Sequence, residues 1–315
     1  MYDKIRKSVF PLLAALIWGV AFVAQTNNTA GAFTFNAMRA IIAFVFLLPV
    51  ILIFTKGDVR HILVENNKKS TKILWIGGVL CGVALCLATY LQQLGIDNGT
   101  EAGKASFLTA TYIIIVPILG IFLKKKAPLT VWISAVIALV GLYLLCIKND
   151  FSIRPSDLLV LACSIVFACH IMIIDKATAS CNGIKLSCIQ FLTMAVVSSI
   201  CAFIFEKPQL TDFTNNAWSV LYLGVCSSGI AYTLQILSQK DANPTVTTLL
   251  LSMESVFGVV AGAIANGEVM LAKEYIGCAL MLIAVVLAQI PIEVLKKTFR
   301  TRKRTEEKEE ETTKE

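Results

Sequence analysis

Charged residues are scarce in this sequence. Asp, Glu, Lys and Arg make up only 16% of the 315 residues, whereas 57% are hydrophobic. Soluble globular domains usually carry about 25% charged residues. Apolar stretches close to the roughly 20 residues that cross a bilayer recur along the chain, and no interval between them is long enough for a soluble domain. The composition excludes a soluble globular protein and predicts an integral membrane protein.

Patterns typical of metal and catalytic sites are also missing. The ten cysteines are scattered through apolar runs without a CxxC pair, so we interpret them as small packing residues. There is no HExxH or GxSxG motif and no pair of carboxylates within one apolar run. We therefore expect no metal and no cofactor. The formal charge of +7 comes mainly from short connections and the chain ends, so we expect no nucleic-acid partner.

Ten apolar segments separated by polar breaks predict an all-α membrane protein with ten transmembrane helices. Their expected ranges are 8–25, 33–55, 72–94, 102–123, 130–147, 157–175, 184–205, 217–238, 244–266 and 274–294. The first segment is long for the apolar region of a signal peptide and further spans follow, so we expect it to be retained. Residues 295–315 lack an apolar face and are expected to form a disordered, charged cytoplasmic tail.

Lys and Arg fall mostly on one side of these spans. This side carries Lys4, Arg6, Lys7, Lys56, Arg60, Lys68, Lys69, Lys72, Lys124, Lys125, Lys126, Lys176, Lys185, Lys240 and the cluster from Lys296 to Arg304. Because cytoplasmic loops are enriched in Lys and Arg, both termini are predicted to be cytoplasmic, as an even number of spans requires. The expected location is the plasma membrane, with the lipid bilayer as surroundings. A monomer and a homodimer both fit the sequence.

The first five spans, residues 8–147, are similar in order and length to the last five, residues 157–294. A shift of 142 positions lays GVALCLATYLQQ over GVCSSGIAYTLQ. The aligned pairs include Tyr90 with Tyr232 and Gln93 with Gln235. Because five is an odd number, the second half enters the membrane from the opposite side, which predicts two inverted five-helix repeats. Such repeats are typical of transporters that open alternately to two sides.

Several short motifs occur in an order typical of one family. The first span contains LIWGVAFV with Trp18 and Gly19, Arg39 opens the second, and the fourth contains TATYIIIVPILG. With the two five-span halves, these features resemble the EamA-type branch of the drug/metabolite transporter superfamily. The resemblance covers Ser8 to Pro291. It implies a basket of helices around a central cavity that carries small polar metabolites by alternating access, and it leaves substrate and direction open.

The sequence departs from this relationship in one respect. Related four-helix multidrug pumps use a glutamate in their first span, whereas LLAALIWGVAFVA contains no acid. This absence counts against proton-coupled drug efflux through such a residue. The second half also lacks a clear counterpart of Arg39, so an asymmetric site is expected.

Two charged residues fall within predicted spans and are the main site candidates, because a charge inside the bilayer costs about 3 kcal/mol or more. Arg39 lies about 9 Å into the second span and either snorkels to the headgroups or faces the cavity. Glu254 lies about 16 Å into the ninth span. It is either a hydrogen-bonded structural group or a cavity residue that binds substrate and couples transport to protons. We predict that the two residues pair across the cavity or share a zwitterionic substrate.

Aromatic and amide side chains in the spans are weaker candidates, because such residues also fill helix interfaces. They are Trp18, Gln25, Tyr90, Gln93, Tyr112, Gln190, Tyr232 and Gln235. His170 is a candidate proton relay with Asp175, or a satisfied packing histidine. Pro117 removes a backbone hydrogen bond from the fourth span, which predicts a hinge or a static kink beside Tyr112.

The predicted function is that of a secondary transporter or facilitator that works by alternating access. An exporter is one form that such a protein can take. Its expected substrate is a small polar metabolite, either amino-acid-like or another small organic solute. The alternative is a membrane-embedded enzyme that acts on a lipid-linked substrate. Such an enzyme would need a nucleophile, a metal cluster or a paired acid and base at one depth in the membrane.

Overall fold

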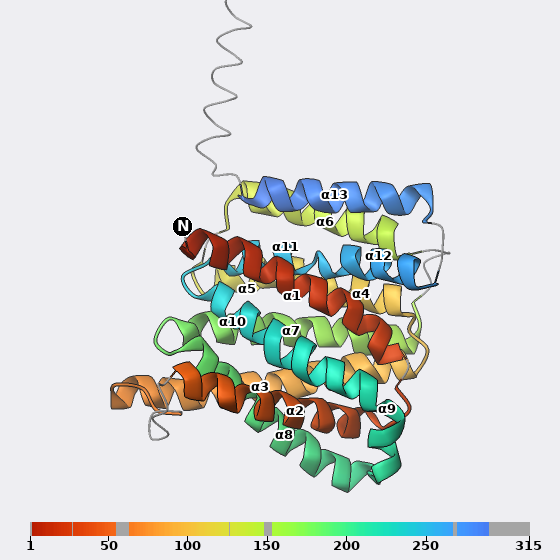
Figure 1. Ribbon diagram of the computed structural model, residues 1–315. Coiled ribbons are helices and arrows are strands. Elements are labelled where there is room, and N and C mark those ends of the chain that lie inside the picture. The colour runs from red at the N-terminus through yellow and green to blue at the C-terminus, as the bar shows by residue number, and fades with distance from the viewer. Residues whose placement is uncertain are drawn as a thin grey trace, which may run out of the picture.

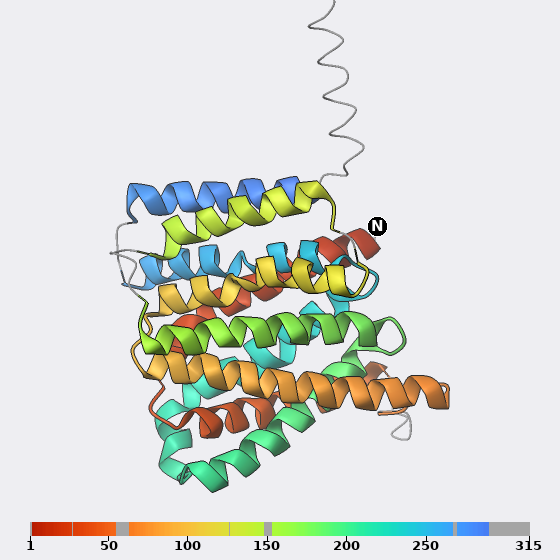
Figure 2. The same cartoon turned by 180° about the vertical axis from the view of Figure 1, so that it is seen from behind.

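The chain folds into a bundle of long helices that lie side by side (Figures 1 and 2). The computed structural model describes residues 2–26, 28–54, 63–125, 127–147, 153–266 and 270–289. Within these ranges ten helical segments are long and apolar enough to cross a membrane, and no strand occurs. This confirms the predicted all-α membrane fold. The expected tail, residues 295–315, lies outside the described ranges.

Seven of the ten spans are single helices, and three are interrupted. The single helices are α1 (Tyr2–Thr26), α2 (Ala32–Phe54), α3 (Lys68–Asp97), α6 (Leu129–Cys146), α7 (Pro155–Thr178), α8 (Gly183–Phe205) and α13 (Ala272–Gln289). The fourth span consists of α4 (Ala102–Ala110) and α5 (Tyr112–Phe122). The eighth consists of α9 (Leu210–Tyr222), the π-helix η2 (Leu223–Tyr232) and α10 (Thr233–Gln239), and the ninth of α11 (Pro244–Leu251) and α12 (Glu254–Asn266).

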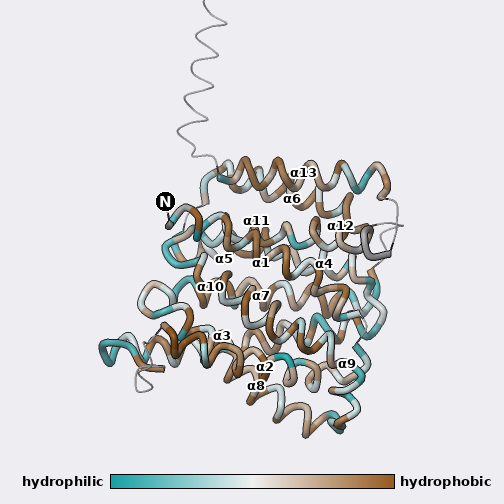
Figure 3. The backbone as a smooth tube through the Cα atoms, in the orientation of Figure 1, coloured by the Kyte–Doolittle hydropathy of each residue, from teal (hydrophilic) through white to brown (hydrophobic). Residues whose placement is uncertain are grey.

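Local sequence explains where several helices begin. The side chains of Asn67, Asn182 and Asn243 accept hydrogen bonds from backbone N–H groups in the first turns of α3, α8 and α11. Such caps satisfy donors that have no partner within the helix. Hydrophilic residues gather at the two ends of the bundle and hydrophobic ones along the helices (Figure 3). We call the end that holds residue 2 the N-terminal end and the other the opposite end.

The two halves pack in the same way, as an inverted repeat requires. Helix α2 lies along α8, α6 lies along α13, and α3 packs on α8 as η2 packs on α2. One contact recurs at residue level. A Cβ atom added to Gly82 would lie 2.6 Å from the Gln190 carbonyl oxygen, and one added to Gly224 would lie 3.2 Å from the Arg39 carbonyl oxygen. The structure thus identifies Gln190 as the counterpart of Arg39, which the sequence did not.

The fourth and ninth spans break at equivalent positions. Helices α4 and α5 meet at Thr111, and α11 and α12 meet at Ser252 and Met253, again 142 positions apart. At each break a hydroxyl donates to the carbonyl three residues earlier: Thr111 to Leu108 at 2.6 Å and Ser252 to Leu249 at 2.8 Å. Such bonds compete with the helical pattern.

The first break corrects the expected cause of the irregularity beside Tyr112. Pro117 lies inside α5, six residues after Thr111, so the interruption itself is not at the proline. The break in the ninth span and the π-helix in the eighth span had no counterpart in the sequence analysis. The eighth span also begins at Leu210, seven residues earlier than expected.

Candidate functional site

A pocket lies in the middle of the bundle, between helices of both halves. Its cavity volume is about 50 Å³, counted as the space that the centres of water molecules can occupy. Its wall consists of Trp18, Ala21, Phe22, Gln25, Arg39, Gln92, Thr109, Tyr112, Phe167, Ile171, Ser227, Tyr232, Gln235, Leu251 and Glu254. Seven of the ten residues predicted to line a cavity are therefore brought together, whereas Tyr90, Gln93 and Gln190 are not.

Arg39 points into this pocket from α2. Its side chain is buried, with 3% of the residue exposed, so it does not snorkel to lipid headgroups. Its Nε donates to the Ser228 hydroxyl at 3.2 Å, and its guanidinium lies beside the Tyr232 hydroxyl. Because Gly224 has no side chain, η2 approaches the backbone of α2 at this point. The close approach brings Ser228 and Tyr232 to the guanidinium.

Glu254 enters the pocket as the first residue of α12, directly after the break in the ninth span. Only 5% of the residue is exposed, and its Oε1 accepts a long hydrogen bond of 3.4 Å from the Tyr112 hydroxyl. Tyr112 is the equivalent residue of the first half, since it begins α5 and lies 142 positions earlier. The two breaks thus meet at this contact.

Helix α1 supports Glu254 from behind. A Cβ atom added to Gly19 would lie 2.6 Å from the Gly258 nitrogen and 2.8 Å from the Glu254 carbonyl oxygen. Both atoms belong to the backbone and cannot move away without shifting α12. Glycine at position 19 therefore allows α1 to pack at backbone distance from the first turn of α12, and explains part of the Trp18–Gly19 motif.

Arg39 and Glu254 face the same pocket without forming an ion pair. The side-chain ion pairs found among the described residues involve other residues, and Glu254 is bonded to Tyr112 instead. The predicted direct pair is therefore not present in this conformation. The pocket presents one buried cation and one buried carboxyl group, each with capacity for further hydrogen bonds.

Two aromatic rings, those of Trp18 and Tyr232, form part of the same pocket wall. The rings of Trp18 and Tyr232 lie 4.6 Å apart, tilted by 57°. The Trp18 indole N–H donates to the Ser227 carbonyl at 3.2 Å. This bond fixes the indole ring, so that its face and not its N–H group is available to a bound solute.

Tyr90 and Gln93 lie outside the pocket although their repeat counterparts line it. Tyr90 stacks on Phe33 with ring centroids 3.8 Å apart. Gln93 donates to the Gln25 carbonyl at 3.3 Å and to Asp97 at 2.8 Å. Helix α3 is a regular α-helix here, whereas the equivalent turns of the second half form η2. Because a π-helix turns less per residue, Tyr232 faces a different direction from Tyr90.

His170 also lies outside the pocket. It is fully buried between α7 and α8, where its Nε2 is 2.8 Å from Oε1 of Gln190. Its expected relay partner Asp175 is a buried carboxylate that forms an ion pair with Lys125. No hydrogen bond joins His170 to Asp175 in the part of the chain that the structure describes.

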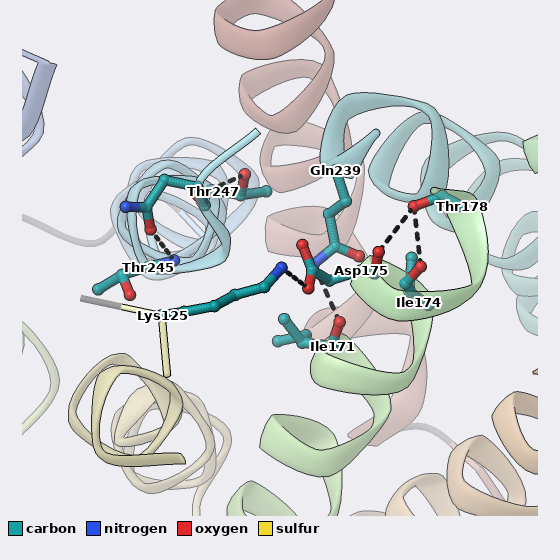
Figure 4. Close-up of polar contacts among 9 residues, drawn as sticks. Lys125, Ile171, Ile174, Asp175, Thr178, Gln239, Thr245 and Thr247 are labelled. Carbon is teal, nitrogen blue, oxygen red and sulfur yellow. Dashed lines mark hydrogen bonds and ion pairs between the residues drawn. The ribbon is translucent and has the colours of Figure 1, made fainter. Parts of the chain in front are cut away.

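The Lys125–Asp175 ion pair belongs to a polar layer next to the pocket. Figure 4 shows Lys125 reaching toward Asp175 and Gln239, whose Nε2 donates to the Ile171 carbonyl at 3.5 Å. The pocket residues Ile171 and Gln235 each precede a member of this layer by four residues, which places both on the same helix face. Ile171 precedes Asp175, and Gln235 precedes Gln239. The layer therefore lies one helical turn from the pocket, toward the N-terminal end.

Sequence reasoning missed Gln92, Thr109 and the serines of η2. Gln92 donates to the Thr109 hydroxyl at 3.0 Å and lines the pocket in place of its neighbour Gln93. The repeat alignment favoured Gln93 because it matches Gln235, and the facing of α3 was not readable from that match. No group of three or more His, Cys, Asp or Glu that could hold a metal occurs in the part of the chain that the structure describes.

Comparisons with known proteins agree with this architecture. The sequence profile of the EamA-like transporter family matches residues 7–147 and again residues 154–289. An uncharacterized transporter of Archaeoglobus fulgidus is 28% identical over 283 residues, which cover 89% of this chain and 84% of that protein. A protein of known crystal structure, 16% identical, shares the fold with a TM-score of 0.72 over 90% of this chain and 96% of that chain. These matches point to transport and not to the enzymatic alternative. The chain belongs to the EamA-like transporter family and is a membrane transporter.

Proposed function

We propose that this protein is a secondary transporter or facilitator that moves a small zwitterionic metabolite, of the amino-acid type, across the plasma membrane. The observation that carries this proposal is the presence of Arg39 and Glu254 in one buried pocket without an ion pair between them. An isolated charge within the membrane is costly, so its retention indicates a use.

A zwitterion is complementary to both groups. The guanidinium of Arg39 has donors beyond the one bonded to Ser228, and its planar fork suits a carboxylate. Glu254 accepts a single long bond from Tyr112, which leaves oxygen lone pairs for an ammonium group. A solute that carries both charges would pair each buried group and leave the complex close to neutral.

The interrupted helices supply the means for alternating access. In transporters built from inverted repeats, substrate sites lie near the midplane beside discontinuous helices. Here the breaks at Thr111 and at Ser252–Met253 place Tyr112 and Glu254 in contact at the pocket wall. We infer that movement of the half-helices about these breaks exposes the pocket to one side and then to the other.

Thermal stabilisation of the purified protein tests the proposal, because a ligand that binds the folded state raises the unfolding temperature. Neutral amino acids should stabilise the wild type more than their decarboxylated amines or deaminated acids. Arg39→Gln and Glu254→Gln should each weaken zwitterion binding by about tenfold to a hundredfold, the range expected for hydrogen bonds to charged groups. Lys69→Gln and Glu101→Gln, which change exposed charges, are the matched controls. Equal stabilisation by amine, acid and zwitterion would contradict the proposal.

We further propose that any proton coupling uses Glu254, because it lines the pocket whereas His170 does not. A carboxyl group in the substrate site can exchange a proton for a bound cation during the cycle. In proteoliposomes, a pH gradient should then drive uptake by the wild type, while Glu254→Gln should be indifferent to the gradient. Wild-type transport that ignores the gradient would identify a facilitator without a titrating group.

The proposed orientation places the N-terminal end of the bundle in the cytoplasm. This end holds Lys68, Lys69, Lys125 and Lys185, as expected for the positive side. A single cysteine introduced at position 66 should react with a membrane-impermeant thiol reagent only after the cells are opened, and one introduced at position 99 should react in intact cells. Each cysteine must be introduced into a variant of the protein that lacks the natural cysteines.

A further inference from the structure

Gln235 stands out among the amides at the pocket because its side chain has no hydrogen-bond partner among the described residues. It lies in α10, lines the pocket and is 2% exposed. Its Oε1 is buried without any hydrogen bond to the described protein groups. Buried amides are almost always hydrogen-bonded, so an unpaired one at a binding pocket requires an explanation.

The other glutamines at or near the pocket are committed to protein partners. Gln92 donates to Thr109, and Gln25 donates to the Ala21 carbonyl at 3.4 Å. Gln93, the repeat counterpart of Gln235, donates its Nε2 to Gln25 and Asp97, while its Oε1 also has no partner among the described residues. The two equivalent amides therefore differ in their donors: the Gln93 amide is bound into the helix packing, whereas Gln235 lines the pocket without such a bond.

The position of Gln235 fits contact with the variable part of a solute. It follows Tyr232 by one helical turn on the same face, and Tyr232 lies beside Arg39. On the other side, Gln239 and the Lys125–Asp175 pair close the space one turn further along. A zwitterion held by Arg39 and Glu254 would therefore extend its side chain into the space between Tyr232 and this polar layer.

We propose that Gln235 is the specificity-determining residue of the site and that it selects solutes whose side chain carries a neutral hydrogen-bonding group, a hydroxyl or a carboxamide. The inference rests on the proposed function and names its substrate class more closely. A carboxamide offers both a donor and an acceptor, so it pairs with either group. An apolar side chain of the same size would cover the amide and leave it unpaired, which a site of this kind rejects.

Isosteric pairs of amino acids test the selection without changing volume. The probes are L-threonine against L-valine and L-asparagine against L-leucine, with binding to the purified full-length protein measured by thermal stabilisation and calorimetry. The wild type should bind the polar member of each pair at least about tenfold more tightly, the effect expected from one buried hydrogen bond. Gln235→Leu should bring both ratios close to one, mainly through weaker binding of the polar members. Gln235→Glu, which keeps an acceptor, should retain part of the preference.

Gln93→Leu is the matched control, because it removes the equivalent amide of the first half from a place outside the pocket. Its affinity ratios should equal those of the wild type even if its unfolding temperature falls. Wild-type ratios near one, or equal weakening of both members by Gln235→Leu, would overturn the assignment of Gln235 while leaving zwitterion binding intact. Binding of no zwitterion by the wild type would overturn the proposed function and this inference together.

Discussion

The pocket side of the first half can be compared with that of the second, residue by residue. Gly82 of α3 packs against the backbone of Gln190, and Gly224 of η2 packs in the same way against Arg39. The same helix contact thus positions an amide in one half and a guanidinium in the other. The amide is bonded to His170 away from the pocket, whereas the guanidinium lines it.

The broken spans differ in the same manner. Tyr112 and Glu254 occupy equivalent places after the two breaks and touch each other, one as a hydroxyl and the other as a carboxyl group. Shared backbone packing is what the proposed alternating access requires, because each half would have to adopt the conformation of the other. Different side chains at equivalent places give the site a cation from one half and a carboxyl group from the other. The scaffold is therefore symmetric in its packing and asymmetric in its chemistry.

An exchange of the paired residues Arg39 and Gln190 should have the largest effect. Gln190→Arg would place a charge at a fully buried position beside His170, with an expected loss of about 3–5 kcal/mol in the free energy of unfolding. Arg39→Gln should fold normally and bind the zwitterion about tenfold to a hundredfold more weakly. Expression level and thermal unfolding in detergent measure the difference. If Gln190→Arg were as stable as the wild type, the two environments would not differ as described.

Substitution of the paired glycines tests whether the shared packing is truly equivalent. A Cβ atom at Gly82 would lie 2.5 Å from the Thr193 Cβ, and one at Gly224 would lie 2.6 Å from the Ile42 Cβ. Gly82→Ala and Gly224→Ala should each lower stability by about 1–3 kcal/mol through overpacking. Val83→Ala, at an exposed neighbour on α3, serves as the control. A large effect at one glycine and none at the other would break the equivalence.

Removal of the ion pairs that attach the fourth span to α7 should have an intermediate effect on stability. Asp157 pairs with Lys104 and also accepts from Thr100 and from the Arg154 backbone, whereas Asp175 pairs with the half-exposed Lys125. Asp157→Asn should cost about 1–2 kcal/mol, and Asp175→Asn about 1 kcal/mol or less, because exposed partners contribute little. Measurements of the free energy of unfolding at low and high salt distinguish the two ion pairs. The reverse order would show that the N-terminal end is the more tightly held.

Loss of the contact between the two breaks should change the stability of the protein least. Tyr112→Phe removes one long hydrogen bond to Glu254, with an expected cost of about 1 kcal/mol or less. Zwitterion affinity should change by only a few-fold, since Glu254 remains in place. Binding measurements on Tyr112→Phe and Glu254→Gln side by side provide the test. Equal losses in both variants would mean that the hydroxyl group contributes as much to binding as the carboxyl group, against this expectation.

Much of the fold was predictable because membrane insertion is a local property. Apolar runs long enough to span the bilayer identified all ten spans, and the expected start of the ninth span at residue 244 is the first residue of α11. Arg39 and Glu254 stood out because charges in apolar runs are rare. The π-helix, the break before Glu254 and the choice of Gln92 over Gln93 were not predictable. They depend on which neighbouring helix each turn meets.

Hydropathy and segment length were enough to predict the number of spans, their inverted arrangement and the two charged residues at membrane depth. Helix packing was needed to show that Arg39 faces inward, that Gln190 is its counterpart and that the Gln93 amide donates to protein groups whereas Gln235 lines the pocket. The direction of a side chain around a helix axis depends on close backbone contacts, such as those of Gly19, Gly82 and Gly224, and on the local helix type. These contacts join residues far apart in the chain, so no single segment contains them.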